Sequence, residues 1–448
     1  MTNDGTSIPI DEDGYITLTS PDSYKTYLLL GKINSYVEVN CVDSYTLTGG
    51  PQEPFEVLSL KIPKKKLIDI SSDFDKPNSI VAGKSRISVN YYGKCDNMIV
   101  TKCKVSGNNY NITAYHECEI IRGLQIEAEL NMDVLSTIKY LISEVDKKLG
   151  YSSGKYSEEG GIVWKYDDNL WPSVDATESS SITGTKVSIP PGVNAWFALQ
   201  VCAMAIGCRV FFANDKVYII DYRLPFKKED EDEEKDEDED FNDISEVDLY
   251  SNRESSYAYG SMISAPEYGE EGFDTVVNSI TINGVETAIN DQHNVNAISI
   301  NVPESIAYFG QRNASTIDTK FLPVQMCLAF GETYLSYLSE PQQSITIEFK
   351  EQSYDNSNSY TSARGLVWSP MFPVLSRVGT FKDTKDSVSV DNTDVYGNIM
   401  PQKLYLSTYT RNYPKGSSTY TFGVMDNISL SQSTSQILTA VGGIVNYR

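Results

Sequence analysis

The sequence predicts a mainly β protein with a few helices, which places the chain in the α+β class. Three observations support this prediction. Tyrosine is abundant, at 30 of 448 residues, and it occurs with many Ser, Thr, Asn and Val residues; the aromatic and β-branched members of this set suit the pleated, half-buried surface of a strand. Apolar and polar residues alternate over the first hundred or so residues, which is the strand period. Three later stretches show the helical period instead.

The first 120 residues are predicted to form a small barrel or sandwich. Strand-like runs recur along this part of the chain and are separated by Gly, Asn, Asp and Pro: TYLLLGKINSYVEV, FEVLSLKI, SRISVNYYG, NMIVTKCKVSG and YNITAYHECEII. Because alternate residues of a strand face opposite sides, each run presents one apolar face for burial. We therefore interpret residues 1–120 as one β-barrel-like domain.

An amphipathic helix is predicted from about Met132 to Leu149. Its apolar residues share one face, and Gly150 stands where such a helix ends. At ~1.5 Å per residue the helix is on the order of 27 Å long, enough to span a small domain. We expect its apolar face to pack on a sheet.

A second helix, followed by a β-hairpin, is predicted in NAWFALQVCAMAIGCRVFFANDKVYIIDYRLP. Asn194 is a suitable helix cap, Gly207 closes the helix, and Asn214 with Asp215 provides the turn between two strands. We expect this helix to bury one face on the hairpin that follows it. Both helices and the hairpin are grouped into an α+β domain at residues 121–226.

The charge of the chain is strongly negative and uneven. The formal net charge is −24, and many of the acidic residues stand in one run, KKEDEDEEKDEDEDFND from Lys227. Like charges lie closer together than the roughly 8 Å Debye length at physiological salt, so residues 227–248 are predicted to be an acidic, disordered and solvated loop. A metal-binding or partner-docking role is the alternative. Gripping nucleic acid is excluded as the main function, because it needs clustered Lys and Arg.

The second half of the chain is predicted to be β-rich with one further helix. Residues 249–354 contain the strands TVVNSITINGVETA, AISINV and QSITIEFK, and they form a second domain in this interpretation. Pro323 marks the first turn of the helix, whose apolar stripe consists of Val324, Leu328, Leu335 and Leu338. Residues 355–448 contain short strands, among them KLYLSTYTRNY and STYTFGVM, and are expected to complete the barrels.

No catalytic, cofactor-binding or metal site is predicted. A Ser or Cys nucleophile normally needs a histidine base, and the chain has only His116 and His293. His116 should share a strand face with Ala114 and Cys118 and is interpreted as structural, whereas His293 is expected in an exposed loop. Neither has a Cys or His partner at metal-ligand spacing, and the seven cysteines include no CxxC pair. Glycan hydrolysis by two carboxylates stays an alternative, since some pair among 61 acidic residues always fits.

Targeting signals are not evident in the sequence. The start, MTNDGTSIPIDEDGYITL, lacks the basic residues and the apolar segment of a secretory signal, so synthesis in a cytosol is expected. No run of about eighteen apolar residues occurs, which predicts the absence of a membrane-spanning helix.

The order of the parts resembles the tail-hub proteins of tailed bacteriophages, also called baseplate hub or tail-tip proteins, whose core also occurs in contractile injection systems. VTKCKVSGNNYNITAYHECEI is similar to the strand-turn-strand that precedes a helix in that family. NAWFALQVCAMAIGCRVFFANDKVYII resembles its helix plus hairpin, NSITINGVE is a third stretch, and SIAYFGQRN resembles its Ser-Ile-x-x-Tyr-Gly-Arg-Arg turn. The resemblance covers most of residues 20–440 in order.

Five residues of the last stretch are candidates for a structural turn or a subunit contact: Ser305, Ile306, Phe309, Gly310 and Arg312. Phe309 stands for the usual Tyr, and Gln311 for the first Arg; the other four match. Gly310 permits a tight or positive-φ bend, and Phe309 can anchor the turn in the core. Arg312 can pair with an acid or a backbone carbonyl of a neighbouring chain. A merely exposed Arg312 is the alternative.

The resemblance implies a non-enzymatic structural protein of the virion, built from β-barrel-like hub domains with inserted helix-plus-hairpin modules. It implies a homotrimeric tail hub at the tail tip or baseplate, which joins the sixfold tail tube to a threefold tip and forms part of the DNA-ejection channel. The implied partners are the distal tail or tail-tube protein, the tape measure protein and a tail fibre or tip protein, with no cofactor. A receptor- or carbohydrate-binding β protein of a phage tail is the alternative, and a glycan hydrolase is a weaker one.

The negative charge suggests how DNA passes through such a channel without specific binding. A trimer carries three times the formal charge of −24, and we expect much of this negative surface to border the channel. Acidity that serves only solubility is the alternative. Because the sequence ends at GGIVNYR soon after the expected core, no lysin activity is expected in this polypeptide.

Overall fold

The computed structural model describes residues 27–32, 35–39, 44–70, 72, 80, 82–83, 85–90, 94–166, 184–213, 216–221, 246–248, 267–270, 276–289, 292–341, 343–350, 377–379, 404–413 and 417–423. The predictions for the acidic loop at 227–248 fall outside these residues, apart from its last three. Most of the C-terminal region at 355–448 lies outside them as well.

Strands dominate the described residues, which confirms the mainly β class. One sheet holds 16 strands. Its main path runs in the spatial order β14 (Glu267–Glu270), β18 (Gln343–Lys350), β21 (Ser417–Phe422), β20 (Leu404–Tyr413), β3 (Ser44–Gly50), β4 (Glu53–Pro63), β7 (Asn109–His116), β6 (Lys94–Ser106), β5 (Arg86–Asn90), β1 (Tyr27–Lys32) and β2 (Ser35–Val39). Each neighbouring pair on this path is antiparallel.

Five further strands join this sheet away from the path: β9 (Ile162–Lys165), β11 (Arg209–Ala213), β12 (Lys216–Ile220), β13 (Glu246–Asp248) and β19 (Arg377–Gly379). The hairpin β11–β12 attaches to β4 through the parallel pair Phe212 and Phe55. The predicted barrel form is not seen in the described part of the chain, where the path stays open and ends at β14 and β2. Among the described strands, β9 and β13 also have a single partner each, so the sheet has further edges besides β14 and β2.

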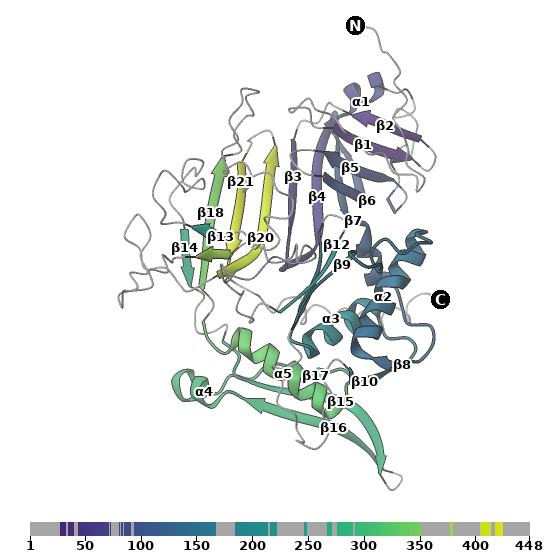
Figure 1. Cartoon of the computed structure of the whole chain (residues 1–448). Helices are drawn as coiled ribbons and strands as arrows, with labels where there is room; N and C mark the ends of the chain where they lie inside the picture. Colours follow the sequence, from purple (N-terminus) through teal and green to yellow (C-terminus); the bar gives the residue numbers. More distant parts are fainter. Residues whose placement is uncertain are drawn as a thin grey trace, which may run out of the picture.

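Strands from both ends of the chain meet in the middle of this sheet. β20 pairs with β3, so residues 404–413 lie beside residues 44–50 (Figure 1). At this junction the hydroxyl of Tyr409 donates a hydrogen bond to Glu56 on β4, and Tyr409 itself pairs with Gly49 on the strand between them. A Cβ on Gly49 would lie 2.7 Å from the Tyr409 hydroxyl and 2.8 Å from Cγ of Glu56. Glycine is therefore required where the side chain of Tyr409 crosses β3.

The helix predicted from about Met132 is α2 (Val134–Leu149), and its ends follow the predicted signals. The side chain of Asp133 accepts a hydrogen bond of 2.8 Å from the backbone N–H of Ser136, which caps the first turn. Gly150 ends the helix with φ 87°. α2 packs against another helix, α3 (Ala195–Ala205), and against the small sheet of β8 (Leu130–Asp133) and β10 (Lys186–Ile189). The sequence predicted that α2 packs on a sheet, and α2 packs on a helix as well.

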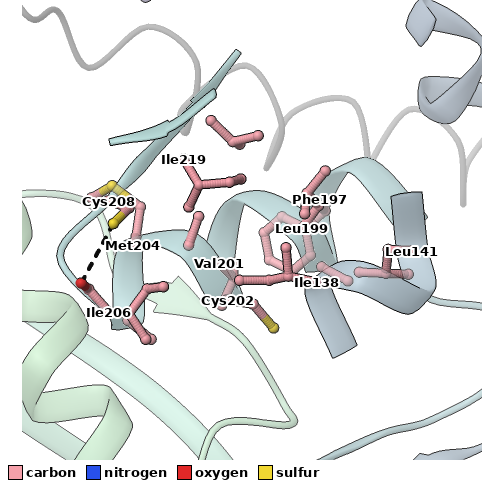
Figure 2. Close-up of a cluster of buried hydrophobic side chains, with 14 of the residues drawn as sticks. Ile138, Leu141, Phe197, Leu199, Val201, Cys202, Met204, Ile206, Cys208 and Ile219 are labelled. Carbon is pink, nitrogen blue, oxygen red and sulfur yellow. Dashed lines mark hydrogen bonds between the residues drawn. The ribbon is translucent and has the colours of Figure 1, made fainter. Parts of the chain in front are cut away.

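α3 lies in the centre of the molecule. Asn194 caps it as predicted, accepting a hydrogen bond of 3.1 Å from the backbone N–H of Phe197. All eleven residues of α3 are buried, whereas the sequence predicted one face buried on the hairpin. It contacts β11, α2, α5 (Val324–Leu338) and the short helix η2 (Glu117–Gly123). Figure 2 shows its apolar side chains surrounded by those of neighbouring elements, such as Ile138 of α2 and Ile219 of β12.

The lower layer in Figure 1 is a separate hairpin covered by α5. β15 (Ser279–Ile289) pairs with β16 (Gln292–Asn301), and the short β17 (Ile317–Asp318) adds to β15. α5 lies so close to the hairpin that a Cβ on Gly331 would stand 2.2 Å from Cδ1 of Ile300. Of its predicted apolar stripe, Leu335 and Leu338 are buried, but Val324 is 40% exposed because the buried face of α5 begins at Met326.

The first prediction concerns the junction of the two chain ends. We expect Gly49→Ala to lower the free energy of unfolding by about 1–3 kcal/mol, because the new methyl group overpacks the space filled by Tyr409 and Glu56. Chemical denaturation followed by circular dichroism measures the effect. Gly123→Ala is the matched control, since a Cβ there meets no atom within 4 Å. Equal stability of the two variants would contradict the close approach described here.

Candidate functional site

The stretch SIAYFGQRN forms a short helix and the bend that ends it, where the sequence predicted only a turn. The helix is α4 (Pro303–Phe309), with the proline in its first turn. Gly310 follows with φ 75° and ψ 168°, so the predicted positive-φ bend is confirmed. This region of backbone space is essentially restricted to glycine. Gly310 thus turns the chain away from α4 toward β17.

Asn278 organises this bend, although the sequence did not single it out. It stands directly before β15 and is fully buried. Its side-chain Nδ2 donates to the Ser305 hydroxyl at 3.2 Å and to the carbonyl oxygen of Gly310 at 2.8 Å. Its Oδ1 accepts from the backbone N–H of Arg312 at 2.7 Å. Both amide hydrogens and the amide oxygen therefore have partners, as a buried amide requires.

Backbone hydrogen bonds extend this connection to α5. The N–H groups of Asn278 and Ser279 both donate to the carbonyl of Arg312, at 3.0 and 3.1 Å. The Ser305 hydroxyl donates to the carbonyl of Ser339, just past the end of α5, at 2.5 Å. We call Asn278, Ser305, Gly310 and Arg312 the Asn278 clasp. The clasp ties the start of β15, the helix α4 and the end of α5 into one unit.

The remaining candidate residues lie on the outer side of the clasp. Phe309 and Ile306 are half-buried, so Phe309 is not the fully buried anchor that the sequence suggested. The ring of Phe309 contacts that of Tyr308, with centroids 4.9 Å apart, and Tyr308 is 84% exposed. Nε of Arg312 donates to the carbonyl of Phe309 in its own chain at 3.3 Å. Its predicted contact with a neighbouring chain stays a prediction.

A buried carboxylate forms a second polar centre, between η2 and the loop after α2. The side chain of Glu117 is fully buried and accepts hydrogen bonds from the hydroxyls of Tyr151, at 2.7 Å, and Tyr156, at 2.8 Å. Arg86 forms a short ion pair with it, and Nζ of Lys155 lies 3.6 Å away. Burial raises the pKa of Glu117, although the charges of Lys155 and Arg86 act in the opposite direction. This arrangement connects β5, η2 and the loop.

The residues considered for catalysis have structural surroundings. His116 is buried, and its Nδ1 accepts a hydrogen bond from the backbone N–H of Cys118, which confirms the structural interpretation. Burial raises the pKa of the Cys118 thiol well above its usual value, so that the reactive thiolate is disfavoured. His293 lies in β16 and not in the expected loop, because β16 continues to Gln292. Within the described ranges, no group of three His, Cys, Asp or Glu side chains is placed to hold a metal ion.

Every helix in the described part of the chain is too short or too polar to cross a lipid bilayer. No model of a known protein family matches the chain. No curated protein matches it either.

Solved structures of tail proteins resemble the chain over most of its length. The tail protein of Neisseria meningitidis is 12% identical with a TM-score of 0.47, over 91% of this chain and 98% of that one. A prophage tail protein of Listeria monocytogenes is 10% identical with a TM-score of 0.46, over 92% and 99%. The 43 kDa tail protein of prophage MuSo2 from Shewanella oneidensis is 10% identical with a TM-score of 0.46, over 90% and 99%.

The second prediction tests the Gly310 bend. We expect Gly310→Asn to lower the free energy of unfolding by about 1–3 kcal/mol, because asparagine does not readily adopt φ 75° with ψ 168°. Gly150→Asn is the matched control: its φ of 87° and ψ of 14° lie in the left-handed helical region, which asparagine tolerates. Thermal unfolding of both variants measures the difference. A larger loss at Gly150 would contradict the backbone assignment.

The third prediction follows from the raised pKa of Glu117. The carboxyl group stabilises the fold most when protonated, so its contribution is fully present below the unfolded pKa of about 4.5 and declines as the pH rises through the higher folded pKa. Glutamine cannot ionise. Stability relative to Glu117→Gln should therefore be greatest at acidic pH and decrease toward neutral pH, which urea unfolding at a series of pH values measures. A difference that grows with pH would show that Lys155 and Arg86 outweigh burial.

Proposed function

We propose that the protein is a structural subunit of a phage tail, a homotrimeric hub at the distal end that joins the sixfold tail tube to a threefold tip. In this role its work is mechanical: it holds partners in register and surrounds part of the channel through which DNA leaves. The proposed partners are the distal tail or tail-tube protein, the tape measure protein and a fibre or tip protein. The proposed location is the virion, at the tail tip or baseplate, after synthesis in the host cytoplasm.

The observation that carries this proposal is that the four stretches of the sequence resemblance contact one another in pairs. Asn278 is the first residue of NSITINGVE, and its side chain binds the backbone of the SIAYFGQRN stretch at Gly310 and Arg312. The first and second stretches meet where the rings of His116 and Phe212 lie 6.1 Å apart. Each stretch by itself is weak evidence for the family. Contacts between the stretches support the proposal, because the parts of one structural core are expected to pack together.

The second and the fourth stretch are connected through the helices. α3, from the second stretch, packs on α5, which follows the fourth stretch in the chain. Phe197 of α3 meets Phe321, just before α5, edge to face with ring centroids 6.2 Å apart. A rigid connection of this kind suits a subunit that transmits force between a tube and a tip.

The open sheet supports the ring that a hub requires. Within the described strands, the path ends at β2 on one side and at β14 on the other. Unpaired edges favour pairing with other chains. Because the two edges differ, contact between them is heterologous, and such contacts generate a closed ring when the rotation between subunits closes.

The alternative, a receptor- or carbohydrate-binding protein, predicts a cluster of exposed aromatic side chains. Among the described residues, the exposed large hydrophobic side chains are Val105, Tyr308 and Val324, and only one of these is aromatic. The described surface therefore favours the hub over the binder. A glycan hydrolase has no observation in its favour here.

The fourth prediction is the mass of the assembly. We expect a particle near three times the subunit mass of 49.9 kDa, measured by mass photometry across a concentration series at physiological salt, with ring-shaped particles on electron-microscopy grids. Dissociation at low concentration back to single subunits is expected, because the subunit has its own core. A stable dimer, or rings of another order, would contradict the threefold hub.

A further inference from the structure

The apolar layer between α5 and the β15–β16 hairpin is open on one side. Ile317 of β17 and Ile280 and Ile282 of β15 are each 7% exposed or less. Ile298 and Ile300 of β16 pair with Ile282 and Ile280 and so point to the same face, but both are only half-buried. Burial thus decreases across the sheet toward β16, the strand at the outer border of this layer in Figure 1.

The first turns of α5 leave the same layer incompletely covered. Gly331 lies against Ile300. Val324 and Leu328 share a face of α5 with Gly331, because helix residues at i, i+4 and i+7 stand above one another. Val324 is 40% exposed and Leu328 is half-buried. The apolar stripe of α5 therefore extends beyond the surface that the hairpin covers.

The backbone of β16 has an open hydrogen-bonding edge. Within the described strands, β16 pairs with β15 alone. The N–H of Val302 donates to the carbonyl of Asn278 at 2.9 Å, and residues that bond the neighbouring strand alternate with residues that do not. From residue 297 onward, the even-numbered residues of β16 therefore bond β15. The backbone groups of three exposed residues point away from β15: Ala297, Ser299 and Asn301.

The sequence of β16 also distinguishes this edge from the others. QHNVNAISIN contains no Lys, Arg, Asp, Glu or Pro. Among the described strands, those at other edges each include at least one charged residue: β2, β8, β9, β10, β13, β14 and β17. Charged residues and proline commonly protect sheet edges against pairing with another chain. β16 lacks this protection and is suited to accept a further strand.

We propose that β16 binds an extended segment of another protein as an added strand. The segment pairs with residues 297–301, a length of about 17 Å at ~3.4 Å per residue. α4 begins at Pro303 beyond one end, and the register of β15 and β16 shifts between Asn283 and Glu286 near the other. So short a strand buries less than the roughly 1,200 Å² of a stable interface between folded proteins. The edge therefore fits a linear segment.

The two faces of the hairpin define the chemistry of this segment. On one face it continues the layer of Ile298 and Ile300, so its alternate residues are apolar, because a charge there would lose its hydration. On the other face it continues Thr281 and Ser299, whose exposed hydroxyls lie 3.0 Å apart, so its remaining residues are small and polar. The bound segment is thus an uncharged chain in which apolar and small polar residues alternate.

A second copy of this chain is a poorer occupant of the edge. Each copy has a formal net charge of −24, and two copies joined over one short strand repel each other. A neutral segment of a different protein approaches without this repulsion. The inference goes beyond the proposed function and does not depend on it, because it concerns one edge of a single chain.

The fifth prediction uses a synthetic probe, a fluorescent peptide of about seven residues in which Val or Ile alternates with Ser or Thr. We expect it to bind the full chain, as measured by fluorescence anisotropy. Ser299→Pro removes an N–H that points away from β15 and should weaken binding about tenfold. Ser299→Ala is the matched control, since it keeps the N–H, and should bind as the unchanged chain does.

Two results of this measurement would overturn the proposal. One is equal binding of the peptide to the proline and alanine variants when both unfold at the same temperature. The other is equal binding of a peptide of the same composition whose apolar residues are consecutive, because such a peptide cannot place them all on the face toward α5.

Hydrogen exchange of the unchanged chain tests the edge without relying on the proline variant. In the isolated chain the N–H groups of Ala297, Ser299 and Asn301 should exchange quickly and those of Ile298 and Ile300 slowly. The alternating peptide, at about 1 mM, should slow the first three about tenfold, as residue-resolved mass spectrometry measures. Slow exchange of these three without peptide, whether constant or increasing with protein concentration, would overturn the proposal, because the chain or a second copy would then cover the edge. No slowing by the peptide would overturn it as well.

Discussion

The complete burial of α3 is the constraint on which the rest of the structure depends. A helix without a solvent-exposed face is stable only when other elements cover it on every side. The hairpin β11–β12, α2, η2 and α5 supply this cover, and each brings its own part of the chain with it. Small residues such as Ala198 and Ala203, both fully buried, permit the close approach. The main sheet and the α5 hairpin layer are thereby held on opposite sides of one helix.

The Asn278 clasp stabilises the short helix α4. α4 is a helix of only seven residues, and helices of this length are marginal in water on their own. Asn278 and Ser305 provide the missing stabilisation, because their side chains satisfy backbone groups of three segments away from water. The exposed Tyr308 therefore stands on a helix that these hydrogen bonds hold in place.

Charged side chains are distributed unevenly over the molecule. The net charge of −24 describes the chain as a whole, whereas the sheet register collects lysines on one face at the end of β4 and β6. The buried carboxylate of Glu117 has Arg86, Lys155 and two tyrosines around it, since an unpaired buried carboxylate is costly. Average charge alone therefore says little about which surfaces attract or repel a polyanion.

The sequence by itself determined the local elements: the mainly β class, α2 with its Asp133 cap and Gly150 end, and α3 with Asn194 and the hairpin after it. These depend on short-range periodicity and capping, which neighbouring residues encode. Only the tertiary structure decided that β20 pairs with β3, that Asn278 supports the Gly310 bend and that Lys61 and Lys104 share a face. These features join residues that are far apart in the chain, and their partners are set by packing and strand register, which no local pattern records.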